Sequence, residues 1–121
     1  MALHHELHRI PLTVAKILYT VRATLPTLPL RGRYLSWLVP DHVLAVQAGG
    51  ATDVRVVLPD RANDTAPAVV EVQYIFPTRR AFDTYVRDHA PALRADGLKH
   101  FPPATGISYE RQVAEIAAEL E

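Results

Sequence analysis

Hydrophobic and polar side chains alternate over four stretches of this chain, and the alternation predicts four strands. The stretches run from Val14 to Thr24, from Thr52 to Leu58, from Ala68 to Phe76, and from about Gly106 to Gln112. Successive side chains of a strand point to opposite faces, so residues two apart share a face. Each strand is therefore expected to have one apolar face and one mixed face. The polar residues 59–67 should join the second and third strands as a hairpin.

The hydrophobic spacing changes to a helical period between the first two strands. From about Arg31, one stripe is formed by Tyr34, Leu35, Leu38, His42, Ala45 and Val46. Two prolines precede this stripe, so we assign residues 25–30 to a connection. Pro40 lies inside the stripe and should kink the helix or split it in two. The pair Gly49-Gly50 should end it.

A second helix should begin near Thr78, directly after the third strand. Its apolar stripe consists of Phe82, Tyr85, Val86, His89 and Leu93. Pro91 is expected to interrupt this helix after Ala90, and Gly97 is expected to close its last turn. The strand, the turn and the helix then form one unit in which the helix packs back on the strand.

Both ends of the chain leave alternatives open. Apolar residues within 1–12 have helical spacing, which allows a short helix. His4 and His8 lie one helical turn apart and could bind a divalent metal, although no acidic or thiol ligand accompanies them at a recognisable spacing. We expect no metal there, and instead a frayed or surface-docked terminus. Residues 113–120 fit a helix, while residues 113–116 also fit an extension of the fourth strand.

The order of the elements is β-α-β-β-α-β, which is the ferredoxin-like pattern. We therefore expect an α+β fold, with a four-stranded antiparallel sheet and both helices on one of its faces. The first and third strands should be central. At 121 residues and 49% hydrophobic, the chain has the size of one domain. We assign residues 14–121 to that domain and residues 1–13 to an N-terminal extension.

The sheet face away from the helices should be mixed in character. It is expected to carry Lys16, Leu18, Thr20, Arg22, Asp53, Arg55, Val57, Glu71, Gln73, Ile75, Ser108, Glu110 and Gln112. Its aliphatic residues provide an apolar surface on which a second copy of the sheet could pack. Its charged residues would then need partners, because they would be removed from water. We favour a homodimer through this open face, of the dimeric α/β-barrel type. The alternative is a solvated face with scattered aliphatic residues.

Composition excludes several partners and sites. Lys and Arg number 13, as do Asp and Glu, so no net charge would attract nucleic acid or an anionic membrane. The chain has no cysteine, which excludes disulfides and thiolate metal sites. It also has no Gly-rich phosphate loop, and we expect it to use no cofactor. The start of the chain lacks the apolar run of a signal peptide, so we expect a cytoplasmic protein.

His42 is the candidate catalytic residue. On the apolar stripe of the first helix, partial burial would lower its pKa and leave it neutral, as a general base requires. The alternative is a histidine that only packs. His89 has the equivalent place on the second helix, and the two histidines could share a metal or a substrate proton if they approach each other.

Aromatic and cationic residues are the candidate ligand contacts. Tyr19, Tyr74, Tyr85 and Tyr109, with Trp37, could line a pocket for a flat aromatic ligand, or they could simply fill the core. Arg94 could clamp a carboxylate, or it could be an ordinary surface residue.

Several short motifs carry a family resemblance. Residues 74–85 read Tyr-x-Phe-Pro-x-x-x-x-Phe-x-x-Tyr, and residues 88–98 read Asp-His-Ala-Pro-x-Leu-Arg-x-x-Gly-Leu; Phe101 and Arg111 follow them. Earlier, Leu18-Tyr19-x-Val21 and Trp37-Leu38 followed by His42 fit as well. Over roughly residues 15–116 the chain resembles a small bacterial family of uncharacterised ferredoxin-like proteins, grouped with the dimeric α/β-barrel superfamily. The superfamily contains cofactor-free monooxygenases, isomerases, cyclases and haem-binding proteins.

The resemblance implies a ligand between the sheet and the helices or in the barrel. The residues that it places there are Trp37, His42, Tyr74, Tyr85, His89 and Arg94. Two hypotheses follow. The first is a dimeric protein that binds a small molecule or a protein partner without catalysis. The alternative is a cofactor-independent monooxygenase, isomerase or cyclase acting on an aromatic or polyketide-like substrate, with His42 as the base. A continuous cavity that touches His42 would favour the enzyme, and a volume filled by Trp37, Phe82 and Leu93 would favour the first hypothesis.

Overall fold

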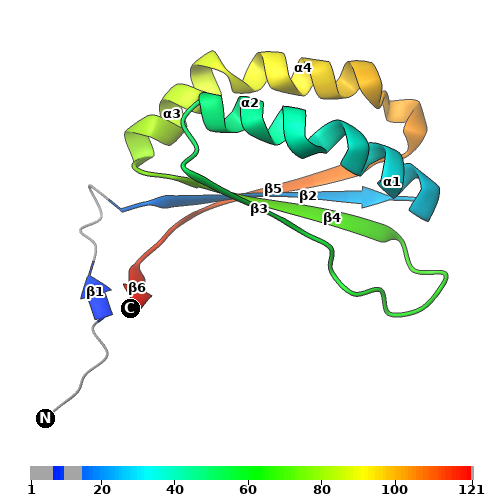
Figure 1. Cartoon of the computed structure of the whole chain (residues 1–121), viewed down its shortest axis with the longest axis horizontal. Coiled ribbons are helices and arrows are strands. Elements are labelled where there is room, and N and C mark those ends of the chain that lie inside the picture. Colours follow the sequence, from blue (N-terminus) through cyan, green and yellow to red (C-terminus); the bar gives the residue numbers. More distant parts are fainter. Residues whose placement is uncertain (1–6, 10–14, 121) are drawn as a thin grey trace, which may run out of the picture.

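Residues 7–9 and 15–120 are described by the computed structural model, which has one layer of helices on one layer of strands (Figure 1). The main sheet contains β2 (Ile17–Leu25), β3 (Asp53–Val57), β4 (Ala68–Phe76) and β5 (Ser108–Glu115). The helical layer contains α1 (Leu28–Trp37), the π-helical turn η2 (Leu38–His42), α2 (Val43–Ala48), α3 (Arg79–Asp88) and α4 (Ala90–His100). A short 3-10 turn, η3 (Pro103–Thr105), leads into β5.

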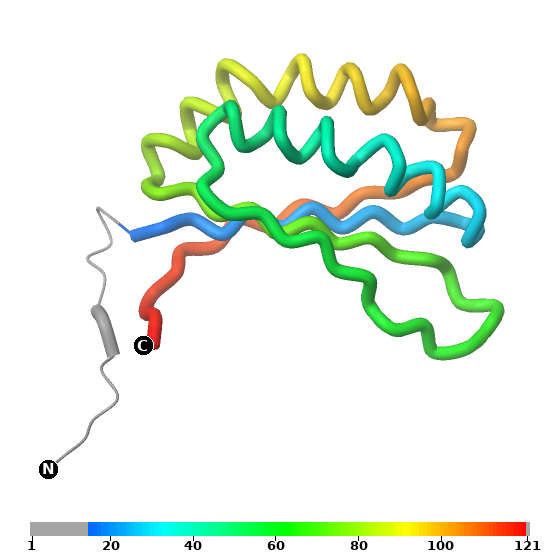
Figure 2. Tube along the Cα trace, viewed as in Figure 1, coloured from blue at the N-terminus to red at the C-terminus, as the bar shows by residue number. Residues whose placement is uncertain are grey.

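The sheet has the strand order β3-β4-β2-β5, and every neighbouring pair is antiparallel. The first and third strands of the ferredoxin-like pattern, β2 and β4, are therefore central, as predicted. They pair over their full length, from Ile17 with Phe76 to Leu25 with Ala68. Residues 58–67 connect β3 to β4 as the expected hairpin, which extends past the end of the sheet (Figure 2).

The two faces of the sheet are those that the alternation predicts. The buried side chains of the central strands include Ile17, Tyr19, Ala23, Val70, Val72, Tyr74 and Phe76, all beneath the helices. On the opposite face Arg22 and Glu71 form an ion pair of 3.1 Å, and the Gln73 amide donates a hydrogen bond of 2.7 Å to Glu71. The open face thus keeps its central charged residues paired within the monomer.

The first helix begins earlier than the prediction near Arg31. The Thr27 side chain caps α1 by accepting a hydrogen bond of 3.2 Å from the Leu30 amide. Pro29 lies in the first turn, where a helix needs no amide donor, so it belongs to the helix and not to the connection. The predicted split at Pro40 is confirmed, since Val39 leaves the helical conformation within η2, with φ −118° and ψ 125°.

The second helix is also split, and its first part ends two residues earlier than predicted, at Asp88 instead of Ala90. Thr78 caps α3 through the Ala81 amide at 3.1 Å. The break falls at His89, with φ −121°, and Pro91 lies in the first turn of α4. The prediction that Gly97 closes the last turn is wrong, because α4 continues to His100 and Gly97 is a buried internal residue.

The ends of the described chain meet in a second, two-stranded sheet. β1 (Leu7–Arg9) pairs with β6 (Ala118–Leu120), antiparallel, on the side of the main sheet away from the helices (Figure 1). The helical alternatives for these two segments are therefore wrong, and the extension of the fourth strand, to Glu115, is confirmed. His4 lies outside the described residues. The division at residues 13 and 14 stays a prediction.

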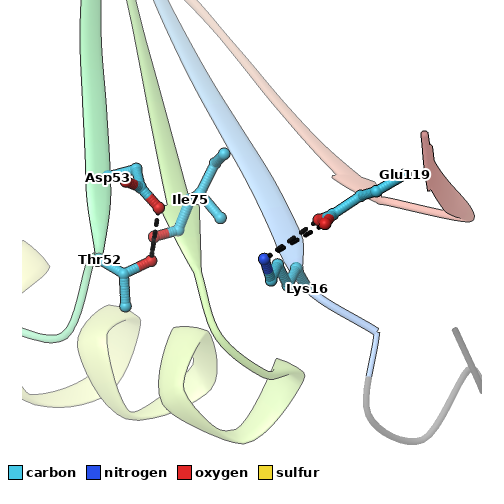
Figure 3. Close-up of polar contacts among 5 residues, drawn as sticks. All are labelled: Lys16, Thr52, Asp53, Ile75 and Glu119. Atoms are coloured by element: carbon cyan, nitrogen blue, oxygen red, sulfur yellow. Dashed lines mark hydrogen bonds and ion pairs between the residues drawn. The ribbon is translucent and has the colours of Figure 1, made fainter. Parts of the chain in front are cut away.

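Polar side chains make further contacts just before β2 and at the start of β3 (Figure 3). Lys16, just before β2, forms an ion pair of 3.2 Å with Glu119 of β6, and its carbonyl accepts a hydrogen bond of 2.9 Å from the Ile116 amide. At the start of β3, the Thr52 hydroxyl lies 3.1 Å from an Asp53 carboxylate oxygen and 3.2 Å from the Ile75 carbonyl. Among the described helices, none is long and apolar enough to cross a membrane.

Candidate functional site

A cavity of about 230 Å³ lies between the sheet and the helices. Its sheet side is formed by Tyr19, Val21, Val72, Tyr74, Tyr109 and Arg111. Its helix side is formed by Tyr34, Trp37, Leu38, His42, Tyr85, Leu93, Arg94, Gly97 and Leu98. The volume beside His42 is therefore open rather than filled.

All five tyrosines of the chain and its single tryptophan contribute to this cavity. The rings pack against one another, with centroids 6.0 Å apart for Tyr19 and Tyr74 and 5.5 Å apart for Tyr34 and Trp37. Phe82, in contrast, packs against Tyr19 and Phe76 in the core and does not line the cavity. The tyrosines therefore combine the two roles that the sequence allows, since they complete the core and also present a wall to the cavity.

His42 ends the π-helical turn and lines the cavity beside Trp37. The two rings are stacked, with centroids 4.3 Å apart and planes at 30°. Burial lowers the pKa of His42, and the Asp96 carboxylate opposes this effect to a smaller extent. The imidazole is thus neutral at neutral pH, and a neutral imidazole can accept a proton.

Burial acts on the tyrosine hydroxyls in the opposite sense. Burial raises the pKa of Tyr85 to about 12, with a further contribution from Tyr19. Burial also raises the pKa of Tyr34, Tyr74 and Tyr109. These phenols are protonated at neutral pH. Tyr34 is hydrogen-bonded to Tyr109, and the hydroxyl of Tyr74 or Tyr85 can donate a hydrogen bond to an oxygen atom of a ligand.

Two arginines approach the cavity from opposite sides. Arg94, on α4, donates a hydrogen bond of 3.3 Å to the Tyr19 hydroxyl. Arg111, on β5, lies over the Tyr109 ring at 5.2 Å from the centroid. No aspartate or glutamate is among the residues that line the cavity. The charged groups in its wall are therefore cations.

The sequence-based site residues separate into two groups. Trp37, His42, Tyr74, Tyr85 and Arg94 are brought together around the cavity. His89 is exposed and does not line it; its ring lies parallel to that of Tyr85 with centroids 6.4 Å apart. Within residues 15–120, no cluster of three or more histidine or acidic side chains is arranged to hold a metal.

Sequence reasoning did not select Tyr34 or Arg111 as site residues. Tyr34 lies on the predicted stripe of the first helix. Arg111 alternates with Ile107 and Tyr109, so its position on the helix side of β5 follows from the period of two. It is the single cation in that helix-facing set, and this is the signal that could have identified it.

Comparison with known proteins supports the fold alone. The chain matches no protein-family model, and no curated protein matches it. Several solved structures do match. The chain has the ferredoxin-like fold. A dimeric ferredoxin-like protein from an uncultured marine organism is 12% identical, with a TM-score of 0.61, over 87% of this chain and 98% of that one.

Two further solved structures match the chain over most of its length, and one of them is named as an enzyme. SnoaB, a cofactor-independent oxygenase from Streptomyces nogalater, is 12% identical with a TM-score of 0.56, over 83% of this chain and 91% of that one. A protein of the ethyl tert-butyl ether D family from Bacillus halodurans is also 12% identical, with a TM-score of 0.59, over 82% of this chain and 98% of that one. At this identity the similarity does not carry function. Membership in the uncharacterised bacterial family stays a prediction.

Proposed function

We propose that this protein binds a small aromatic molecule in the cavity between the sheet and the helices. The observation that carries the proposal is that the cavity stays open although all five tyrosines and Trp37 surround it. Flat aromatic walls favour flat ligands through stacking, and phenolic hydroxyls fix the orientation of ligand oxygens. A cavity of this size, lined mainly by aromatic side chains, suits a small molecule better than a protein partner.

The size of the cavity limits the ligand. Its volume of about 230 Å³ is below the ~300–1,000 Å³ that drug-sized ligands occupy. A compound of roughly one or two fused rings therefore fits best, with its ring plane against Trp37. No cofactor is required for this binding.

The chain's single tryptophan provides the test. We would record the one indole N–H resonance of Trp37 in a proton–nitrogen correlation spectrum while adding 2-naphthol. The control is decahydro-2-naphthol, which has the same skeleton without aromatic rings. Saturable shifts with 2-naphthol and weaker ones with the control are expected. An indole resonance that 2-naphthol leaves unchanged would contradict the proposal.

We further propose that two copies associate through the open sheet face. This face offers Leu18, Val57 and Ile75 as apolar contacts. It also carries arginines and glutamates, so a face turned toward its own copy can match unlike charges. The solved structure from the marine organism is named as a dimeric protein, which is compatible with this arrangement.

A second candidate function is catalysis without a cofactor, as a monooxygenase, isomerase or cyclase acting on an aromatic or polyketide-like substrate. Two observations favour it: the cavity touches His42, as this hypothesis requires, and burial in the cavity wall keeps the imidazole of His42 neutral. Each of these reactions can begin when a base removes a proton from a carbon next to a carbonyl group. His42 would accept that proton, while Tyr85 or Arg94 would hold the oxygen on which negative charge develops.

Proton exchange separates the two candidates. 2-Tetralone is a two-ring aromatic ketone with acidic C–H groups, and their replacement by deuterium in heavy water can be followed by NMR. Catalysed exchange that His42→Gln abolishes, with binding of 2-tetralone retained, would support the enzyme. Binding of 2-tetralone without faster exchange would leave the protein as a binding module.

A further inference from the structure

We propose that the ligand of this cavity is an aromatic acid, whose carboxylate is bound between Arg94 and Arg111. The inference rests on the proposed function, because it assumes that the cavity receives an aromatic molecule, and it adds the charge and the chemical class of that molecule. Its basis is that two guanidinium groups from different elements meet one cavity that no carboxylate lines.

Arg94 reaches the cavity from above the sheet. It extends from α4 to the hydroxyl of Tyr19 on β2, a hydrogen bond of 3.3 Å across the space between the two layers. A phenol hydroxyl occupies only part of the five donors of a guanidinium. The remaining donors are available to a ligand.

Arg111 reaches the cavity from the edge strand. It pairs with Val21 of β2, and its guanidinium lies over the face of Tyr109. Such a cation–π contact restrains the guanidinium and leaves its N–H groups available for hydrogen bonds. Tyr109 therefore positions Arg111 without using up its donors.

Some arginines within residues 15–120 have a carboxylate beside them, and for Arg94 and Arg111 the structure shows none in that range. Arg22, Arg79 and Arg87 each lie within ion-pair distance of a carboxylate. Among the ion pairs formed within residues 15–120, none includes Arg94 or Arg111. A planar, two-oxygen anion is the group that matches the fork of an arginine.

The guanidiniums of Arg94 and Arg111 both act on the hydroxyl of Tyr85, which lines the cavity. Both guanidiniums lower the pKa of Tyr85, against the larger effect of burial. A carboxylate near the Tyr85 hydroxyl would therefore meet both positive charges and a phenolic donor. The aromatic part of the ligand would then extend toward Trp37.

Calorimetric titration with a matched pair of probes tests the inference. Naphthalene-2-carboxylate and naphthalene-2-carboxamide have the same rings and nearly the same shape, and only the first is charged. The protein should bind the carboxylate about tenfold more tightly or better. Arg94→Gln and Arg111→Gln should each reduce this preference, and the double variant should abolish it. Arg87→Gln, an exposed change outside the cavity, should preserve it.

The outcomes separate this inference from the proposed function. Equal affinity for the two probes, or a preference that survives in the double variant, would overturn the carboxylate site while leaving the aromatic cavity in place. Binding of neither naphthalene compound would contradict the aromatic cavity itself, and the inference with it. A carboxylate preference that decreases as salt is added would support the role of the two charges.

Discussion

The imidazole ring of His42 lies on the indole ring of Trp37, with centroids 4.3 Å apart and planes at 30°. This stack links the end of α1 to the end of the π-helical turn, which is where the helical layer changes direction. It also removes one side of the imidazole from water. The same contact thus shapes the cavity wall and helps to keep His42 neutral.

The lowered pKa of His42 predicts a pH-dependent stability. In the unfolded chain His42 takes up a proton at about pH 6.5, whereas in the folded chain it does so only at lower pH. The unfolded state therefore binds more protons in this window. The contribution of His42 to the stability of the folded chain, complete above about pH 6.5, is lost as the pH falls through the pKa of His42 in the folded chain. We expect urea unfolding to show this loss in the wild type and a shallower loss in His42→Gln. A loss of stability of the same slope in the wild type and in His42→Gln would contradict the lowered pKa of His42.

The tyrosines predict the opposite behaviour at alkaline pH. Tyr85 has its pKa raised to about 12, above the value near 10 of an unfolded chain. Its stabilising contribution is complete below about pH 10 and is lost as the pH rises through about 12. Ionisation of the buried tyrosines, followed by tyrosinate absorbance, should coincide with unfolding followed by circular dichroism. Tyrosinate absorbance that rises fully near pH 10, before any unfolding, would contradict the burial of these hydroxyls.

Two buried glycines predict opposite effects of the same substitution. A Cβ atom on Gly97 would lie 3.4 Å from the Trp37 ring, an ordinary contact, so Gly97→Ala should stabilise the protein by about 0.5–1 kcal/mol through helix propensity. A Cβ atom on Gly49 would lie 3.0 Å from the Tyr85 ring and 3.1 Å from that of His89. Gly49→Ala should therefore destabilise it by about 1–3 kcal/mol. Urea unfolding of both variants is the measurement, and equal effects would contradict this packing.

The open sheet face predicts a specific way to separate the proposed dimer. Ile75 is half-buried on that face, so Ile75→Glu should place a carboxylate in the interface and give a monomer. Val86→Glu, on the exposed side of α3, is the matched control and should leave the dimer intact. Sedimentation analysis distinguishes the two. A wild-type chain that sediments as a monomer would refute the dimer, and a dimeric Ile75→Glu variant would exclude this face.

The faces of the sheet could be assigned from the sequence because their period is short and regular. Val21 and Arg22 must point to opposite sides of β2, and burial then decides which side meets the helices. The boundaries of the helices are harder to predict from the sequence. A proline ends a helix interior but suits a first turn, and the hydrophobic pattern alone does not distinguish these two roles for Pro29, whereas the capping contact of Thr27 does.

Longer-range contacts explain the remaining differences. A glycine can end a helix or admit a neighbour, and Gly97 does the second because Trp37, from a distant segment, packs on it. The pairing of β1 with β6 joins segments that no local pattern connects. His89 shares the periodic stripe of Tyr85, but the helix breaks at His89 itself, and its ring lies outside the cavity. The absence of a cofactor and the cytoplasmic location stay predictions.

The phenol hydroxyls around the cavity should favour ligands that can form hydrogen bonds with them. We expect a space lined by protonated hydroxyls, an imidazole and two guanidiniums to take up water before a ligand enters, because polar groups in a wall bind water. An entering molecule must replace those hydrogen bonds as well as cover the rings. Oxygen atoms around the edge of an aromatic ring would do both, so a plain hydrocarbon of the same shape should be rejected.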